Sequence, residues 1–268
     1  MKMTQRDLLV GLQRFEFAQA AALDKKQLIL QGVIASLAVV CQFLPGNYAA
    51  AGGVLIFLVV IAAFFLIYRC KQRRAIAEKA RRATLLVGGL GLVLAHNDEH
   101  WFRNKSSLEP DELAKWNDPN FFNTTQEPGE RRLIEMLREC ALFSSHSFQA
   151  SANKILFLLA GSFLTMLLCL LLGYKLQDVP TRVFTSLASS LIFFELLMRY
   201  LQYGEAVSDT DSIVQRLALI QEAGYPKDGF LLVLGDYNSI VEGAPLMFPG
   251  IYDTNQDKLN KDYDSTYG

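Results

Sequence analysis

The chain has 268 residues, of which 51% are hydrophobic, and its mean hydropathy is +0.19. The formal net charge of −1 argues against a surface that binds nucleic acid duplexes through bulk positive charge. The hydrophobic residues gather in long uncharged blocks that alternate with charged segments. This distribution, more than the composition, indicates an all-α membrane protein whose spanning helices are joined by segments in water.

Residues 1–27 predict a cytosolic amphipathic helix. Leu8, Leu12 and Phe15 recur at helical spacing, and Lys and Arg residues lie in the same stretch. A long apolar core and a small-residue cleavage site are both missing from this stretch, so we expect no cleavable signal peptide. Packing against other helices of the chain is the favoured role, and a position on the membrane surface is the alternative.

Residues 28–68 predict a first transmembrane hairpin. The apolar run 28–44 ends in a Pro-Gly-Asn turn at 45–47, and 49–68 contains no charge. At ~1.5 Å per residue, twenty helical residues span ~30 Å, the thickness of a bilayer's hydrocarbon core. Basic residues precede the hairpin, and four more follow it: Arg69, Lys71, Arg73 and Arg74. The positive-inside rule therefore places both ends of the hairpin in the cytosol.

Residues 69–154 predict a mainly helical cytosolic insert, because their apolar stretch 84–95 is too short to span a bilayer. Three glycines in that stretch match neither GxGxxG nor a P-loop, and we expect them to allow close helix packing: Gly88, Gly89 and Gly91. Capping residues predict a further helix from Ser106 to Trp116. A loop over 117–129 and a long helix from Glu130 follow.

Residues 155–202 predict a second transmembrane hairpin. The run 155–174 is free of charge, 175–182 has the composition of a short turn, and 183–198 is apolar again. The remaining residues, 203–268, form a cytosolic C-terminal segment. The predicted protein thus crosses the membrane four times, with both termini in the cytosol.

Polar residues stand out in the last apolar run. Ser186 and Ser190 lie one helical turn apart, as do Thr185 and Ser189, so they form a stripe of small hydroxyl side chains. Close helix packing is the favoured interpretation of this stripe, and a pore wall formed by assembled subunits is the alternative. A carboxylate at the edge of the hydrocarbon needs a partner. Glu195 is that carboxylate, and Arg199, one turn later, is its expected partner.

No pattern in the sequence indicates an enzyme, a cofactor or a metal centre. His96 and His100 fit neither HExxH nor HxxEH, so a solvated helix end is the favoured interpretation. Cys140 and His146 specify no catalytic triad. The four cysteines have no paired spacing, and we expect them to be reduced.

Three stretches, taken with the two-hairpin layout, resemble a known family. They are RRATLLVGGLG at 81–91, GERRLIEMLRECALFSSHSF at 129–148 and APLMFPGIYDTNQDKLN at 244–260. Together they look like the bacterial four-transmembrane pore-forming effectors of anti-phage immunity, which accompany synthases of cyclic oligonucleotides. The resemblance implies a protein of the inner membrane whose cytosolic part senses a signal. It also implies that the helices assemble into a homo-oligomer and breach the lipid bilayer.

A cyclic nucleotide made by a neighbouring synthase is the signal that this resemblance implies. Such a ligand needs cations for its phosphates and flat rings for its bases. The cytosolic segments offer seven candidates: Arg81, Arg82, Arg131, Arg132, Trp101, Trp116 and Tyr237. For each of them, a solvated charge or a core aromatic is the alternative. Two other functions stay open, namely a membrane anchor that recruits a cytosolic partner and a small housekeeping channel.

Overall fold

The computed structural model describes residues 4–109, 112–118, 121–173, 179–224 and 229–251, and these contain seven helices and no strand. The all-α fold predicted from the sequence is therefore confirmed. Four helices are long: α1 (Gln5–Cys41), α2 (Gly46–Leu90), α5 (Glu130–Gly173) and α6 (Val179–Glu222). Three are short: α3 (His96–Lys105), α4 (Leu113–Trp116) and α7 (Gly229–Gly243).

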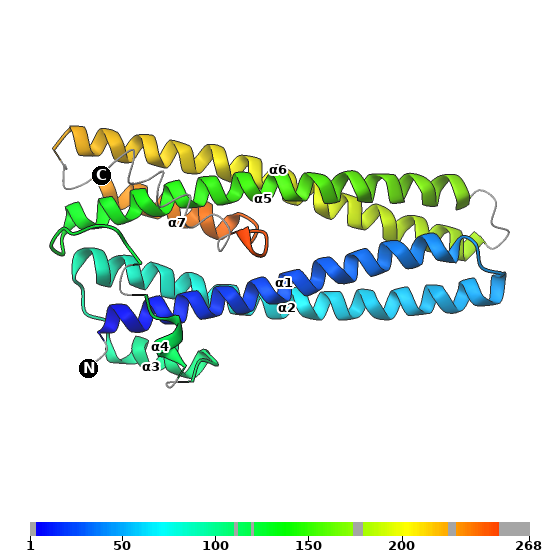
Figure 1. The fold of residues 1–268 in the computed structure, drawn as a ribbon, viewed down its shortest axis with the longest axis horizontal. Coiled ribbons are helices and arrows are strands. Elements are labelled where there is room, and N and C mark those ends of the chain that lie inside the picture. Colours follow the sequence, from blue (N-terminus) through cyan, green and yellow to red (C-terminus); the bar gives the residue numbers. More distant parts are fainter. Residues whose placement is uncertain (1–3, 110–111, 119–120, 174–178, 225–228, 252–268) are drawn as a thin grey trace.

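The long helices form two antiparallel hairpins, α1 with α2 and α5 with α6 (Figure 1). Each hairpin packs far more extensively within itself than against the other. Gly52 permits the close approach of α1 and α2 near their turn, because a Cβ there would overlap Sγ of Cys41. The molecule is elongated as a result, and α7 lies between the hairpins at the end that carries the N-terminus (Figure 1).

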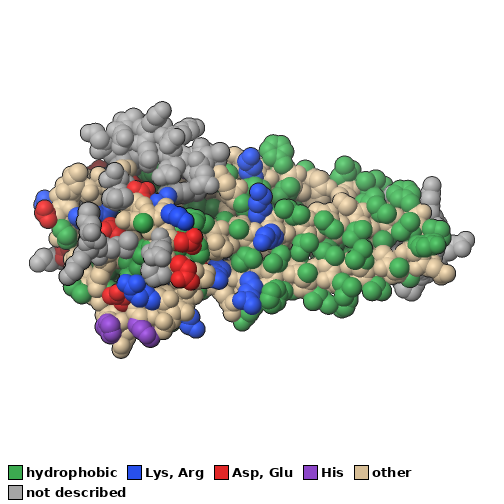
Figure 2. Space-filling model, turned by 60° about the horizontal axis from the view of Figure 1, so that its bottom comes forward, with side chains coloured by type: hydrophobic (Ala, Val, Ile, Leu, Met, Phe, Trp, Pro, Cys, Tyr) green, Lys and Arg blue, Asp and Glu red, His purple; other side chains and the backbone are tan. Residues whose placement is uncertain are grey.

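The two halves of the hairpins differ in their surface (Figure 2). The half near the turns exposes apolar side chains on all four long helices, among them Ile29, Phe57, Phe64, Phe157, Leu171 and Leu191. Two helices, Asn47–Leu90 and Glu130–Leu171, are long and apolar enough to cross a membrane. Only 11% and 22% of their most apolar windows are buried, so these windows are not the core of a soluble bundle.

A belt of exposed cations separates this apolar half from the charged half (Figure 2). Lys25 and Lys26 lie on α1, Arg69 and Lys71 on α2, and Lys154 on α5, and all five side chains are exposed. Basic residues at this position are typical of the cytosolic boundary of a membrane protein. We call these five residues the cation belt.

Each long helix continues from one half into the other. The predicted segment boundaries at 27/28, 68/69, 154/155 and 202/203 all fall inside a continuous helix of 37 to 45 residues. At ~1.5 Å per residue such helices are ~55–67 Å long, about twice the hydrocarbon thickness. The charged half is therefore built largely from extensions of the helices that carry the apolar surface.

Helices α3 and α4 pack near the first half of α1. A capping box between Thr4 and Asp7 starts α1, and α3 and α4 cover its buried leucines with Phe102 and Leu113. The predicted helix from Ser106 to Trp116 is wrong in its first part, since α3 ends at Lys105 and residues 106–109 are not helical. Among the described residues of this stretch, only the single turn of α4 is helical. Ser106 does not cap a helix start. Its hydroxyl donates to the buried Glu16 of α1 at 2.6 Å and so directs the chain away from α3.

Glycines close the contact between α2 and α5, as the sequence predicts. A Cβ at Gly89 would lie 2.8 Å from Cδ1 and 3.0 Å from Cα of Leu133. Gly91 ends α2 with φ +71°, a conformation that favours glycine.

The second hairpin differs from expectation near its turn, because α6 begins at Val179, four residues earlier than predicted. Residues 174–178 of the predicted turn and residues 252–268 of the predicted C-terminal segment lie outside the described residues. Helix α7 was not predicted from the sequence.

Candidate functional site: a cavity between the hairpins

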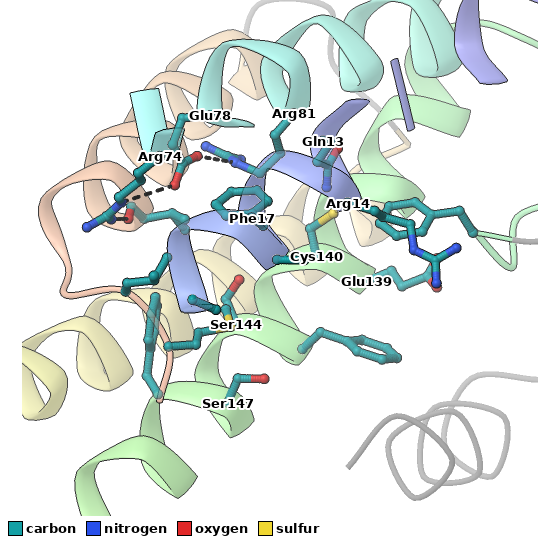
Figure 3. A pocket seen from close by; sticks show the side chains of 18 of the residues that line it. Gln13, Arg14, Phe17, Arg74, Glu78, Arg81, Glu139, Cys140, Ser144 and Ser147 are labelled. Atoms are coloured by element: carbon teal, nitrogen blue, oxygen red, sulfur yellow. Dashed lines mark hydrogen bonds and ion pairs between the residues drawn. The ribbon is translucent and has the colours of Figure 1, made fainter. Parts of the chain in front are cut away.

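A cavity of about 320 Å³ lies in the charged half of the molecule (Figure 3). Both hairpins contribute to its wall, α1 and α2 from one side and α5 from the other. Helix α7, the segment 245–249 and residues around Trp116 and Phe121 complete the lining. Most of the lining side chains are apolar or aromatic, with a few charged groups among them. This combination is typical of small-molecule sites.

A cluster of charges on α2 joins the cavity to α7. The Arg81 Nε donates to Oε2 of Glu78 at 2.7 Å, and the Arg74 Nε lies 3.7 Å from the other oxygen of Glu78. The Arg74 Nη2 also donates to the carbonyls of Val241 and Glu242, at 2.8 and 3.2 Å. Both residues lie in the last turn of α7, where helix carbonyls have no partner within the helix, and Arg74 satisfies them.

Arg81 is the most deeply buried cation of the site, with 6% of the residue exposed. Its guanidinium lies 5.0 Å from the ring centre of Tyr237. Burial lowers the Arg81 pKa, but Tyr237 and Glu78 outweigh burial, so the pKa is raised and the charge is permanent. Nη1 and Nη2 form no hydrogen bond with any described residue, although Nη2 lies 3.8 Å from the Glu242 carboxylate. The side chain thus keeps donors free.

Gln13 of α1 also contributes an uncommitted polar atom. The residue is 8% exposed, and its Oε1 accepts no hydrogen bond from the described residues. Gln13 and Arg81 lie on neighbouring helices at the same side of the cavity, above Phe17 (Figure 3). Buried polar atoms without a partner are costly, and a bound polar ligand is one way to satisfy them.

The remaining polar groups of the wall are weakly reactive. Burial, assisted by Glu139, raises the Cys140 pKa to about 12, so this residue is a neutral thiol and not a nucleophile at neutral pH. Ser144 and Tyr237 lie within hydrogen-bond distance of each other, at 3.2 Å. The described residues include no group of three His, Cys, Asp or Glu side chains that could hold a metal ion. The arrangement is suited to binding.

Three of the seven predicted ligand residues come together in this cavity: Arg81, Trp116 and Tyr237. The other four lie elsewhere. Arg82 pairs with Glu242 at 3.1 Å, Arg132 donates to the Gln126 carbonyl at 2.8 Å, and Arg131 is exposed. The Lys79 ammonium lies over the ring of Trp101, and its Nζ is 3.8 Å from the ring centre.

Sequence reasoning missed Gln13, Phe17 and Arg74, which line the same cavity. One signal was present, since the polar Gln13 lies beside Leu12 within the apolar stripe of the first helix.

A second polar cluster joins the hairpins close to the cation belt. Glu195 of α6 accepts from Gln27 at 2.8 Å and from Gln31 at 2.6 Å, both on α1. Arg199 donates to Glu195 at 3.3 Å and to Asp24 at 3.0 Å. The predicted pair of Glu195 with Arg199 is confirmed, whereas the three α1 partners were not predicted. We call these five residues the junction network.

The hydroxyl stripe of α6 divides into two parts. Thr185 and Ser189 are buried, and Thr185 accepts a hydrogen bond from Gln42 of α1 at 2.5 Å. These two residues confirm the prediction of close packing between helices. Ser186 and Ser190 are half-buried, and Ser190 donates to the Ser186 carbonyl of its own helix at 2.8 Å. A pore wall made by these residues stays a prediction.

His96 and His100 lie on exposed turns of α3, as a solvated helix end requires.

No known protein family matches the chain, and searches of the curated proteins and of the solved structures found no match. The geometry of the cavity and of the apolar surface therefore carries the functional argument.

Proposed function

We propose that this protein is a signal-gated membrane effector with four spanning helices, whose membrane half responds to a ligand bound in the cavity. One observation carries the proposal. Three of the helices that line the cavity, α1, α2 and α5, continue without a break into the half that exposes apolar side chains. A ligand that changes the spacing of these helices at the cavity must therefore tilt or rotate their apolar ends.

The membrane placement rests on the cation belt and on helix length. From the belt to the turns, α2 and α5 each run about 20 residues, or ~30 Å, without a charge. Helices α1 and α6 lie beside them and expose Ile29 and Leu191 at the same level. In the proposed topology all four helices cross, and the cation belt and the cavity are on the cytosolic side.

The junction network is the proposed connection between ligand and membrane. It joins Asp24, Gln27 and Gln31 of the first hairpin to Glu195 and Arg199 of the second. Because the apolar hairpins attract each other weakly within lipid, polar contacts of this kind stabilise their docking. Separation of the hairpins frees helix surfaces that can pair with other copies of the chain. The family resemblance further implies that the chains assemble in the bacterial inner membrane and that the resulting leakage serves anti-phage defence.

A second candidate function is a membrane anchor that recruits a cytosolic protein. Large apolar side chains are exposed in the charged half, on α6 and α7, where no lipid covers them in the proposed topology: Leu219, Leu231 and Leu232. Exposed leucines outside the membrane are typical of surfaces that bind another protein. This alternative predicts a stoichiometric partner that co-purifies and is lost on Leu232→Glu.

Dye leakage from liposomes tests the proposal. The purified full chain is reconstituted with entrapped dye, and cyclic mono-, di- and trinucleotides and small aromatic acids are added in turn. We expect leakage with one compound class, and loss of that leakage in Arg81→Gln. Arg103→Gln, which breaks an exposed pair with Glu99 on α3, is the matched control and should leak as the wild type does. Tight liposomes with every compound, together with a co-purifying partner, would favour the anchor.

A further inference from the structure

We propose that the cavity binds a compact aromatic monoanion: one ring or two fused rings, with one anionic oxygen group held by Arg81 and one donor directed to Gln13. This inference rests on the proposed function, because it names the chemistry of the ligand that the same cavity senses. The proposed ligand is smaller than the cyclic oligonucleotide that the family resemblance implies, and it belongs to a different chemical class. Three properties of the cavity lead to it, namely its volume, its charge and its walls.

The volume sets the size of the ligand. The cavity holds about 320 Å³, at the lower end of the roughly 300–1,000 Å³ that ligand pockets span. One ring or two fused rings with small substituents fill such a space. Two bases with their sugars and phosphates do not, unless the hairpins first move apart.

The charge of the wall sets the charge of the ligand. Three guanidiniums line the cavity, on Arg14, Arg74 and Arg81, together with two carboxylates, on Glu78 and Glu139. Three positive and two negative charges leave a net charge of +1. One anionic group would neutralise it. The free Nη1 of Arg81, on a residue more than nine-tenths buried, is the donor that such a group can reach.

The walls favour a flat molecule. Aromatic side chains from several parts of the chain line the cavity, among them Phe17, Trp116, Phe121, Phe148 and Tyr237. Aromatic rings stack on or meet each other edge to face, with a gain beyond simple burial. The uncommitted Oε1 of Gln13 accepts a hydrogen bond, so a ring N–H or O–H of the ligand has a partner there. A flexible aliphatic acid would satisfy Arg81 but would leave both of these features unused.

A matched series of probes tests the inference on the full chain in lipid nanodiscs. The series is 4-hydroxybenzoate, the uncharged 4-hydroxybenzamide, and benzoate, which lacks the hydroxyl donor, with a cyclic dinucleotide as the large probe. Binding is measured by ligand-detected NMR, which does not require leakage. We expect 4-hydroxybenzoate to bind at least tenfold more tightly than the amide, and more tightly than benzoate and the dinucleotide.

Variants assign the selectivity to residues. Arg81→Gln should remove the preference for the acid over the amide, and Gln13→Leu should remove the preference for 4-hydroxybenzoate over benzoate. Arg82→Gln is the control, because Arg82 pairs with the same Glu242 but does not line the cavity. Should Arg81→Gln fail to fold, Gln13→Leu and the wild-type order of probes still decide.

Equal binding of acid and amide, an acid preference that persists in Arg81→Gln, or tightest binding of the dinucleotide would each overturn the inference. Failure of the proposed function is a separate result. Acid-selective binding without leakage under any condition would refute the gated effector and keep the ligand assignment. Leakage triggered by the dinucleotide alone would refute the ligand assignment and keep the gated effector.

Discussion

Removal of Arg199 is the sharpest test of the link between the two hairpins. Its guanidinium lies 3.0 Å from Asp24 on α1 and 3.3 Å from Glu195 on its own helix. Asp24 is 4% exposed, so water cannot replace the lost partner. Arg199→Gln keeps a hydrogen-bonding side chain but removes the charge. Two carboxylates then face each other across the hairpin interface, and we expect the hairpins to part more easily.

The size of the effect follows from the geometry. Two unit charges 3.0 Å apart interact by about 5 kcal/mol at an effective dielectric constant of 20, and desolvation offsets part of this attraction. Loss of one partner of a buried pair costs roughly 3–5 kcal/mol, because the other charge stays behind. For a chain of this size, a loss of about 3 kcal/mol lowers Tm by roughly 6–12 °C.

The assay combines thermal unfolding in detergent with dye leakage from liposomes. Arg199→Gln should lower Tm and leak without any ligand, whereas the exposed-pair control Arg103→Gln should change neither. The double variant Asp24→Asn/Arg199→Gln should recover at least ~1 kcal/mol relative to the sum of the single changes. Additive losses, or a lowered Tm with tight liposomes, would refute the role of the junction network in docking the hairpins.

Two further predictions concern helix packing and pH. Gly89→Val should destabilise the protein by about 1–3 kcal/mol in denaturant titrations, because the new side chain meets the backbone of Leu133. Gly204→Ala on α6 is the control, since its Cβ meets nothing within 4 Å, and the substitution should be neutral or slightly stabilising. The Cys140 pKa of about 12 lies above the ordinary value of 9.0, so its contribution to stability is complete below pH 9 and is lost as the pH rises toward 12. Cys140→Ser should therefore flatten the alkaline loss of Tm. Cys140 of the folded protein should resist alkylation at pH 8 until denaturant is added, and rapid labelling of the native chain would contradict the raised pKa.

Much of the fold could be read from the pattern of charge along the sequence. Long uncharged runs, the Pro-Gly-Asn turn and the basic flanks predict helical hairpins, because each depends only on residues close in sequence. The pairing of Glu195 with Arg199 was predictable for the same reason, since one helical turn separates them. The wrong helix from Ser106 shows the limit: its capping pattern is real, but the hydroxyl bonds to Glu16, 90 positions away in the sequence.

The candidate site depends on contacts that local patterns do not contain. Arg81 was selected for its charge, but the same rule selected Arg131, which is exposed. What distinguishes Arg81 is the packing of α7 and α2 around it, which buries the guanidinium and leaves its outer nitrogens free. Gln13 is a candidate ligand residue for the same reason, because the helices around it bury its side chain.

The sequence by itself determined that this protein is helical, where its apolar half begins and which end carries the cations. Hydrophobic runs and charged flanks act through the bilayer and through helical periodicity, and both are properties of the linear chain. The tertiary structure alone decided that the hairpins meet at Asp24 and Arg199 and enclose a cavity at Arg81. The contact of Asp24 with Arg199 joins residues 175 positions apart, and the cavity is lined by parts of several helices, so only the packing of whole helices specifies them.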